Sequence, residues 1–192
     1  MSGVHHAIVE TPEPTGTGSW LWAEEDQTRE FAQRMALQIG LLDSYIELEG
    51  NLGAGKTTFV RHLLQALGVK GRIKSPTYAV VEPHEAMVSS SEAITHIWHF
   101  DFYRFNNPEE FEEAGFRDVF ASQGLKIAEW AKQALGMLPL PDLKLKITVN
   151  ELAGRQVEVA AYTARGLQIL QGMQDSKSST MPFTSSHANE SP

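Results

Sequence analysis

The sequence predicts a single α/β domain, and three observations lead to this prediction. The chain has 192 residues, which is enough for one well-packed domain and too few for two large ones. Segments with helical periodicity alternate along it with short apolar segments typical of strands. At residues 45–67 a short strand pattern, a glycine-rich loop and an amphipathic helix pattern follow one another directly. This alternation favours helices packed on a sheet.

The two ends of the chain differ in composition from its middle. The first nineteen residues are rich in Thr, Pro, Gly and Glu, and the last twenty or so are rich in Ser. Such segments lack the apolar content that offsets the entropy of ordering a chain. We therefore expect disordered tails at 1–19 and 172–192 and a folded domain at 20–171.

The elements of the domain follow from periodicity and end signals. Phe31, Met35, Leu37 and Ile39 recur at helical intervals and precede Gly40, so a helix is expected there. A second helix should begin within 56–58 and end at Gly68. A third is expected at 108–121, with Pro and acids in its first turn, and a polar hairpin loop at 84–92. Strands are expected at 45–49, 77–83, 93–101, 125–129, 144–150 and 155–161.

Composition excludes several classes of function. The net charge of −8 argues against binding nucleic acid through overall charge. Without cysteine, neither a disulfide framework nor a thiolate metal site is possible. No signal peptide pattern or membrane-spanning apolar run is present, which indicates a cytoplasmic protein with no membrane association.

The glycine-rich loop GNLGAGKT at 50–57 matches the pattern G-x-x-x-x-G-K-[ST] and lies between a strand and a helix. Its glycines let the backbone N–H groups approach phosphate oxygens, and the helix adds the positive end of its dipole. Lys56 is expected to reach the β- and γ-phosphates, and the Thr57 hydroxyl to bind Mg²⁺. The sequence thus predicts an ATP and Mg²⁺ site at Gly50, Asn51, Leu52, Gly53, Ala54, Gly55, Lys56, Thr57 and Thr58.

Phosphoryl chemistry also needs an acid near the metal, commonly at the carboxyl end of a neighbouring strand. Two residues qualify as metal ligands, since Asp101 ends the apolar run 97–100 and Glu129 ends 125–128. Both stay candidates at this point, and either could instead cap a strand. The seven histidines form no convincing ligand cluster: His96 and His99, three residues apart, lie on opposite faces of a strand.

Four blocks make the sequence resemble the bacterial TsaE (YjeE) ATPases of tRNA threonylcarbamoyladenosine (t6A37) biosynthesis. They are GNLGAGKTTFVRHLLQALG at 50–68, KSPTYAVVEP at 74–83, HFDFYRF at 99–105 and IAEW at 127–130. The resemblance extends over about residues 22–161. It implies one P-loop NTPase-like domain with a central mixed sheet flanked by helices, and a weak Mg²⁺-dependent ATPase.

The resemblance also assigns roles to residues and partners. It places Thr77 in a switch-like loop near the γ-phosphate. It makes Lys56, Thr77, Asp101 and Glu129 catalytic, with Glu129 the expected Mg²⁺ carboxylate. Glu25 and Arg155 would approach the nucleotide from either side. The implied partners are the proteins TsaB and TsaD, which would hold most of the tRNA, so that this chain contacts tRNA only indirectly.

Two other functions are compatible with the loop. A small-molecule kinase would need an Arg-bearing lid and an acceptor pocket, and the arginines are scattered along the sequence. A nucleotide-dependent binding module without turnover is also compatible, because the loop motif indicates phosphate binding and not hydrolysis.

Overall fold

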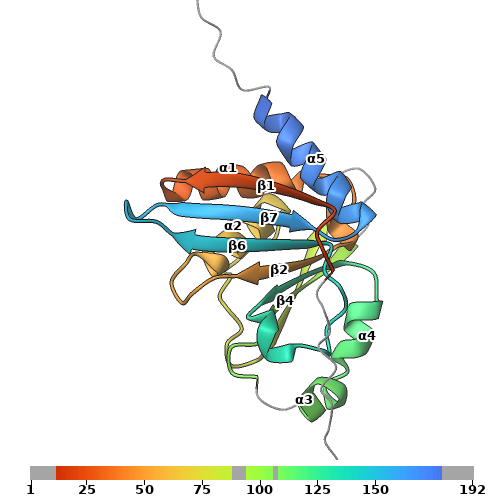
Figure 1. Cartoon of the computed structure of the whole chain (residues 1–192). Helices are drawn as coiled ribbons and strands as arrows, with labels where there is room; N and C mark the ends of the chain where they lie inside the picture. Colours follow the sequence, from red (N-terminus) through yellow and green to blue (C-terminus); the bar gives the residue numbers. More distant parts are fainter. Residues whose placement is uncertain (1–11, 88–93, 106–107, 179–192) are drawn as a thin grey trace, which may run out of the picture.

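The computed structural model describes residues 12–87, 94–105 and 108–178. The expectations for the outer parts of both tails and for most of the 84–92 loop lie outside these residues. The described chain forms one seven-stranded mixed sheet with helices on both faces (Figure 1). This confirms the predicted α/β class and mixed sheet.

The sheet has the strand order β1-β7-β6-β2-β5-β4-β3. Its four central strands, β6, β2, β5 and β4, are parallel, whereas β1, β7 and β3 pair antiparallel with their neighbours. Because the central strands are parallel, their carboxyl ends meet at one edge of the sheet. The bounds are β1 (Gly16–Trp22), β2 (Tyr45–Glu49), β3 (Val81–Met87), β4 (Ile94–Asp101), β5 (Leu125–Glu129), β6 (Leu143–Val149) and β7 (Arg155–Ala161).

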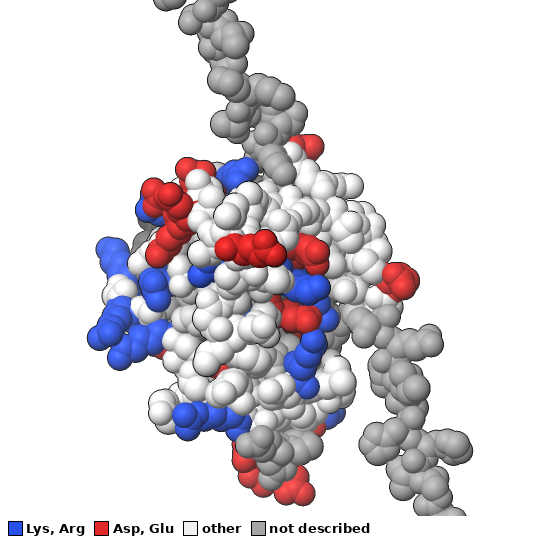
Figure 2. Space-filling view, turned by 60° about the vertical axis from the view of Figure 1, so that its left-hand side comes forward, with Lys and Arg blue, Asp and Glu red and all other residues white. Residues whose placement is uncertain are grey.

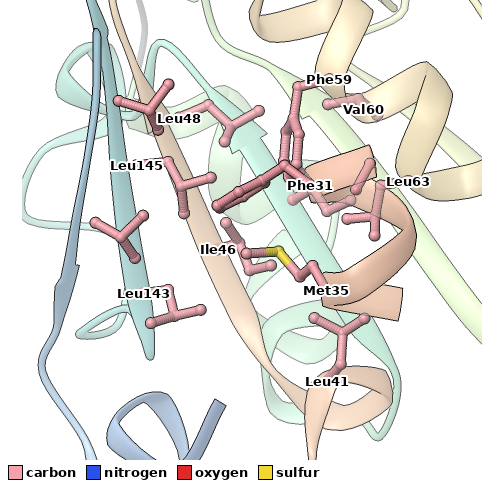
Figure 3. Close-up of a cluster of buried hydrophobic side chains, with 14 of the residues drawn as sticks. Phe31, Met35, Leu41, Ile46, Leu48, Phe59, Val60, Leu63, Leu143 and Leu145 are labelled. Carbon is pink, nitrogen blue, oxygen red and sulfur yellow. The ribbon is translucent and has the colours of Figure 1, made fainter. Parts of the chain in front are cut away.

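One face of the sheet is covered by α1 (Glu25–Ala36), α2 (Lys56–Ala66) and α5 (Ala164–Ser178), which together with the strands bury the main core. Figure 3 shows Phe31 and Met35 of α1 and Phe59 and Leu63 of α2 meeting the alternate residues of β2 and β6. The helix spacing of about 3.6 residues and the strand spacing of two each place these apolar side chains on a single face. This packing fixes the start of α2 beside the end of β2.

The opposite face carries a smaller, aromatic core under α3 (Pro108–Glu113) and α4 (Phe116–Ala121). Phe100 and Phe102 stack with centroids 5.5 Å apart, and Phe116 packs edge-on against Phe100. Two short 3-10 helices, η1 (Leu41–Asp43) and η2 (Ala131–Ala134), join elements at either end of the sheet. Within the described ranges, no helix has the length and apolar character needed to cross a bilayer.

The structure corrects several expected boundaries. Strand β1 starts at Gly16, inside the expected tail, and pairs with β7 along its whole length. Helix α5 extends beyond the expected end at 171 and buries Met173. The helix expected at 108–121 is interrupted at Gly115, whose left-handed backbone (φ 69°) separates α3 from α4. The strand expected at 77–83 starts instead at Val81 and continues through Met87, into the expected loop.

Candidate functional site

The glycine-rich loop joins the end of β2 to the start of α2, and its backbone requires glycine. A Cβ atom on Gly50 would lie 2.5 Å from the Ile147 carbonyl oxygen of the neighbouring strand β6. Gly55 caps α2 in a left-handed conformation with φ 108°, which other residues rarely adopt. The N–H groups of the first turn of a helix have no partner within the helix. The loop therefore places hydrogen-bond donors at the carboxyl edge of the parallel strands.

Lys56 is the first residue of α2, and its side chain is only 5% exposed. Its ammonium donates hydrogen bonds to the carbonyl oxygens of Gly50 (2.8 Å) and Asn51 (3.1 Å) and lies 4.2 Å from the centroid of a Trp130 ring. Burial lowers the Lys56 pKa, and the negative charge of Glu129 opposes that shift. The cation is thus held inside the loop by oxygen atoms and an aromatic face.

Thr57 and Glu129 meet directly, although 72 residues separate them. The Thr57 hydroxyl donates to the Glu129 carboxylate, with distances of 2.8 Å to Oε1 and 3.1 Å to Oε2. Glu129 ends β5, next to β2, and is 2% exposed. A hydroxyl and a carboxylate are the hard oxygen ligands that Mg²⁺ prefers, and Mg²⁺ sites beside phosphates commonly use only one or two protein carboxylates. The pair fits such an ion, and within the described part of the chain no cluster of three or more His, Cys, Asp or Glu residues offers an alternative metal site.

His99 is a site residue that sequence reasoning missed. Its Nε2 lies 2.9 Å from Glu129 Oε1, and the side chain is fully buried. The spacing to His96 correctly placed the two histidines on opposite faces of β4, but it could not indicate the contact with β5. That contact depends on the register, in which His99 faces Ile127 and Asp101 faces Glu129. The available sequence signals were the position of His99 two residues before Asp101 and its place at the start of the block HFDFYRF.

Asp101 holds the segment that follows α2 instead of contacting Thr57. Its Oδ2 accepts hydrogen bonds from the hydroxyls of Ser75 and Thr77, the latter at 2.9 Å, and its Oδ1 accepts one from the Tyr103 N–H at 3.0 Å. The structure therefore brings Thr77 and Asp101 together. This pair lies next to the Thr57–Glu129 pair, because Asp101 and Glu129 are opposite each other on the adjacent strands β4 and β5. Of the two candidate acids, Glu129 is the one placed against the loop hydroxyl.

Two clefts border the loop. A cleft of about 280 Å³ brings together Glu25, Thr58 and Arg155 beside Gly55. Arg155 donates from Nε to the Ala54 carbonyl oxygen at 2.9 Å, and Glu25 contacts His62 at 2.9 Å. The other cleft, of about 400 Å³, is lined by Asn51 and Trp130 among others. Leu52 is not packed in the loop, since its side chain is 80% exposed.

A strand, a glycine-rich loop and a helix in this order, with a carboxylate at the end of the adjacent parallel strand, form the arrangement typical of α/β proteins of the P-loop class. A family model described as "Threonylcarbamoyl adenosine biosynthesis protein TsaE" matches residues 22–157, most of the chain. The chain belongs to the TsaE family.

Comparisons with individual proteins agree with this membership. The chain is 40% identical over 125 residues to the tRNA threonylcarbamoyladenosine biosynthesis protein TsaE of Haemophilus influenzae, covering 65% of this chain and 75% of that protein. It is 32% identical over 142 residues to the TsaE protein of Streptomyces coelicolor, covering 72% and 90%. The crystal structure of Bacillus YdiB matches with a TM-score of 0.64 at 22% identity, covering 84% of this chain and 97% of that one, which supports the fold.

Proposed function

We propose that this protein is an ATP-binding, Mg²⁺-dependent ATPase of tRNA t6A37 biosynthesis, acting in the cytoplasm with TsaB and TsaD. The observation that carries the proposal is the direct contact between the Thr57 hydroxyl and the Glu129 carboxylate at the mouth of the glycine-rich loop. We infer the t6A37 biosynthesis pathway from membership of the TsaE family, because the relatives are named as tRNA threonylcarbamoyladenosine biosynthesis proteins.

The loop residues bind and orient the phosphates in this proposal. Backbone N–H groups at the start of α2 donate to phosphate oxygens, and the helix dipole favours their negative charge. Lys56 exchanges its hydrogen bonds to the Gly50 and Asn51 carbonyls for bonds to phosphate. Because its ammonium already lies within the loop, this exchange needs only a side-chain movement.

Thr57 and Glu129 would hold the ion, which would supply positive charge to neutralise the negative charge of the phosphates. His99 fixes the Glu129 carboxylate by a hydrogen bond, so the carboxylate faces Thr57 in one orientation. Asp101 keeps Ser75 and Thr77 near the same place, where their hydroxyls can meet the γ-phosphate side of the nucleotide.

The nucleoside fits the cleft formed by Glu25, Thr58 and Arg155, which opens beside Gly55 at the start of α2. In this position Glu25 and Arg155 contact the nucleotide from opposite sides. Isothermal titration calorimetry with ATP, in the presence and absence of Mg²⁺, tests the site. Micromolar binding that requires Mg²⁺ supports it, and the absence of ATP binding contradicts it.

The products formed from ATP distinguish the proposed function from its two alternatives. A small-molecule kinase would yield a phosphorylated acceptor, and a binding module would bind ATP without releasing phosphate in the presence of TsaB and TsaD. We expect no phosphorylated acceptor, because no segment of the described chain carries clustered arginines as a kinase lid does. We also expect phosphate release that depends on the two proteins, in line with membership of the TsaE family.

A further inference from the structure

Two of the lysines that the structure describes are buried: Lys56 is 5% exposed and Lys126 is 4% exposed. Buried lysines are normally paired with a carboxylate, because an isolated buried charge is costly. Three more exposed lysines, Lys132, Lys144 and Lys146, each have a carboxylate oxygen within 4 Å. Figure 2 shows Lys and Arg side chains beside Asp and Glu over part of one face. Neither buried lysine has a carboxylate that close among the described residues.

Lys126 has the same kind of surroundings as Lys56. Its ammonium donates a hydrogen bond to the Ser122 carbonyl oxygen, as the Lys56 ammonium does to two carbonyl oxygens of the glycine-rich loop. Each ammonium also lies over an indole ring, at 5.3 Å from the Trp98 centroid for Lys126 and 4.2 Å from a Trp130 centroid for Lys56. A buried cation that is bound only by neutral acceptors is suited to an external anion.

Lys126 lies at the edge of the sheet opposite the glycine-rich loop. It is the second residue of β5 and pairs with Tyr45, the first residue of β2, whereas Glu129 is the last residue of β5. A cleft of about 350 Å³ at this edge is lined by Lys126 and by Ser122, whose carbonyl oxygen binds the ammonium. Figure 1 shows α4 and the start of α5 at this edge, away from the arrowheads of β2 and β6. The cleft is therefore separate from the candidate site.

The other charged residues of the cleft limit the charge that a ligand can carry. Arg165 lies 2.9 Å from Asp43 and 3.7 Å from Asp142, so its own charge is already paired. Burial lowers the pKa of Lys126, and the negative charges of Asp43 and Asp142 oppose that shift, so both carboxylates act on the ammonium. A single negative charge can pair with Lys126, whereas a second one would be repelled by the two carboxylates.

Part of the cleft wall is apolar. The rings of Tyr45 and Phe120 meet edge-on with centroids 4.9 Å apart, and Pro139 and Leu140 lie on the same wall, with Leu140 46% exposed. Small-molecule sites combine apolar walls with a few polar groups that fix the orientation of the ligand. This wall suits a ring or a short alkyl chain whose acidic group reaches Lys126.

Lys126 also has a structural role that is compatible with binding an anion. Ser122 is the C-cap residue of α4, and a cation at this position interacts favourably with the free carbonyl groups and the dipole of the helix. The contact uses one of the three N–H donors of the ammonium. The remaining donors are enough to bind a carboxylate.

We propose that the cleft between α4 and the start of α5 binds a small organic monocarboxylate with an apolar body, and that its carboxylate pairs with Lys126. The inference does not depend on the proposed function, because the cleft and the nucleotide site lie at opposite edges of the sheet. A ligand in this cleft should therefore leave ATP binding unchanged.

The test compares three ligands that share a benzene ring: phenylacetate, its neutral analogue phenylacetamide, and the dianion phenyl phosphate. Binding to the full chain is followed by NMR, from the shifts of the backbone N–H groups at residues 122–126. Phenylacetate should bind saturably with a Kd of about 1 mM or tighter, and each of the other two about tenfold or more weakly. Equal affinities for phenylacetate and phenylacetamide overturn the proposal, as does the absence of saturable shifts. Tighter binding of phenyl phosphate overturns the assignment to a monocarboxylate.

A pair of variants tests the role of Lys126. Lys126→Met removes the ammonium and keeps a flexible side chain, and the matched control Lys146→Met removes an exposed lysine that pairs with Glu158. Phenylacetate should bind Lys126→Met about tenfold or more weakly and the control like the wild type. Equal affinities for the two variants overturn the proposal; if Lys126→Met does not fold, the ligand series on the wild type still decides.

ATP separates this cleft from the nucleotide site. Phenylacetate should stay bound when ATP is added, and the ATP affinity of both variants should equal that of the wild type. Displacement of phenylacetate by ATP would place it at Lys56 and overturn the proposal. Absence of ATP binding to the wild type would contradict the proposed function and leave the result for phenylacetate unaffected.

Discussion

Replacing Glu129 by Gln isolates the charge of the carboxylate from its shape. Glu129 Oε1 lies 2.8 Å from the Thr57 hydroxyl and 2.9 Å from His99 Nε2. The amide oxygen of Gln can occupy the same position and accept both hydrogen bonds. At the other carboxylate position, the amide nitrogen can donate to the Thr57 oxygen, 3.1 Å away. The variant should therefore keep its fold, with a loss of roughly 1–2 kcal/mol as two charged acceptor bonds become neutral ones.

The expected functional effect is larger than the structural one. ATP should still bind through the loop backbone and Lys56. Phosphate release stimulated by TsaB and TsaD should fall at least tenfold, which corresponds to about 1.4 kcal/mol in the barrier, because a neutral amide is a poor Mg²⁺ ligand. The assay measures ATP affinity, partner-stimulated phosphate release and tRNA modification on one preparation.

Glu47→Gln is the matched control, since it removes one carboxylate charge from β2, the strand beside β5, and Glu47 pairs with Lys144. It should behave like the wild type in turnover. Near-normal turnover in Glu129→Gln would refute the metal-ligand role and transfer it to Asp101. Loss of ATP binding together with loss of native circular dichroism would instead show that Glu129 is only structural.

Further substitutions test other parts of the site and the fold. Lys56→Ala should weaken ATP binding by roughly ten- to a hundredfold, about 1.5–3 kcal/mol, with native circular dichroism; unchanged affinity by calorimetry would remove Lys56 from phosphate binding. Thr57→Ala should reduce the Mg²⁺ dependence of ATP binding, and a dependence equal to wild type would exclude Thr57 as a ligand. Burial lowers the pKa of His84 below its usual 6.5, so the unfolded chain takes up a proton first as the pH falls. The free energy of unfolding should therefore decrease as the pH falls below about 6.5, and less steeply in His84→Gln; equal slopes in urea titrations would contradict this.

The local features of the site were predictable because each depends on a short stretch of consecutive residues. The strand, loop and helix at 45–66 follow from apolar spacing and from the glycines at 50, 53 and 55. The two candidate acids were also predictable, because each ends an apolar strand. The choice between them was not, because it depends on which strand end faces the Thr57 hydroxyl.

The features that sequence reasoning missed depend on contacts between distant segments. The strand β1 contains two glycines among its seven residues, and it is stabilised by pairing with β7, about 140 residues away. The glycines of α5 look like helix breakers, but a Cβ atom on Gly166 would lie 1.9 Å from the Asp142 carbonyl oxygen. Glycine at position 166 therefore allows α5 to pack closely against Asp142, and its presence does not argue against a helix. Likewise, the contact of His99 with Glu129 requires the register of β4 and β5, which no spacing within one segment gives.

Phosphate release from ATP tests the proposed activity, measured with the full chain alone, with TsaB and TsaD, and with small-molecule acceptors. We expect slow release by the chain alone, faster release when both proteins are present, and no phosphorylated acceptor. The partner-dependent release should require Mg²⁺ and the Glu129 carboxylate. Release that does not respond to TsaB and TsaD, or a phosphorylated small molecule, would contradict the proposed activity.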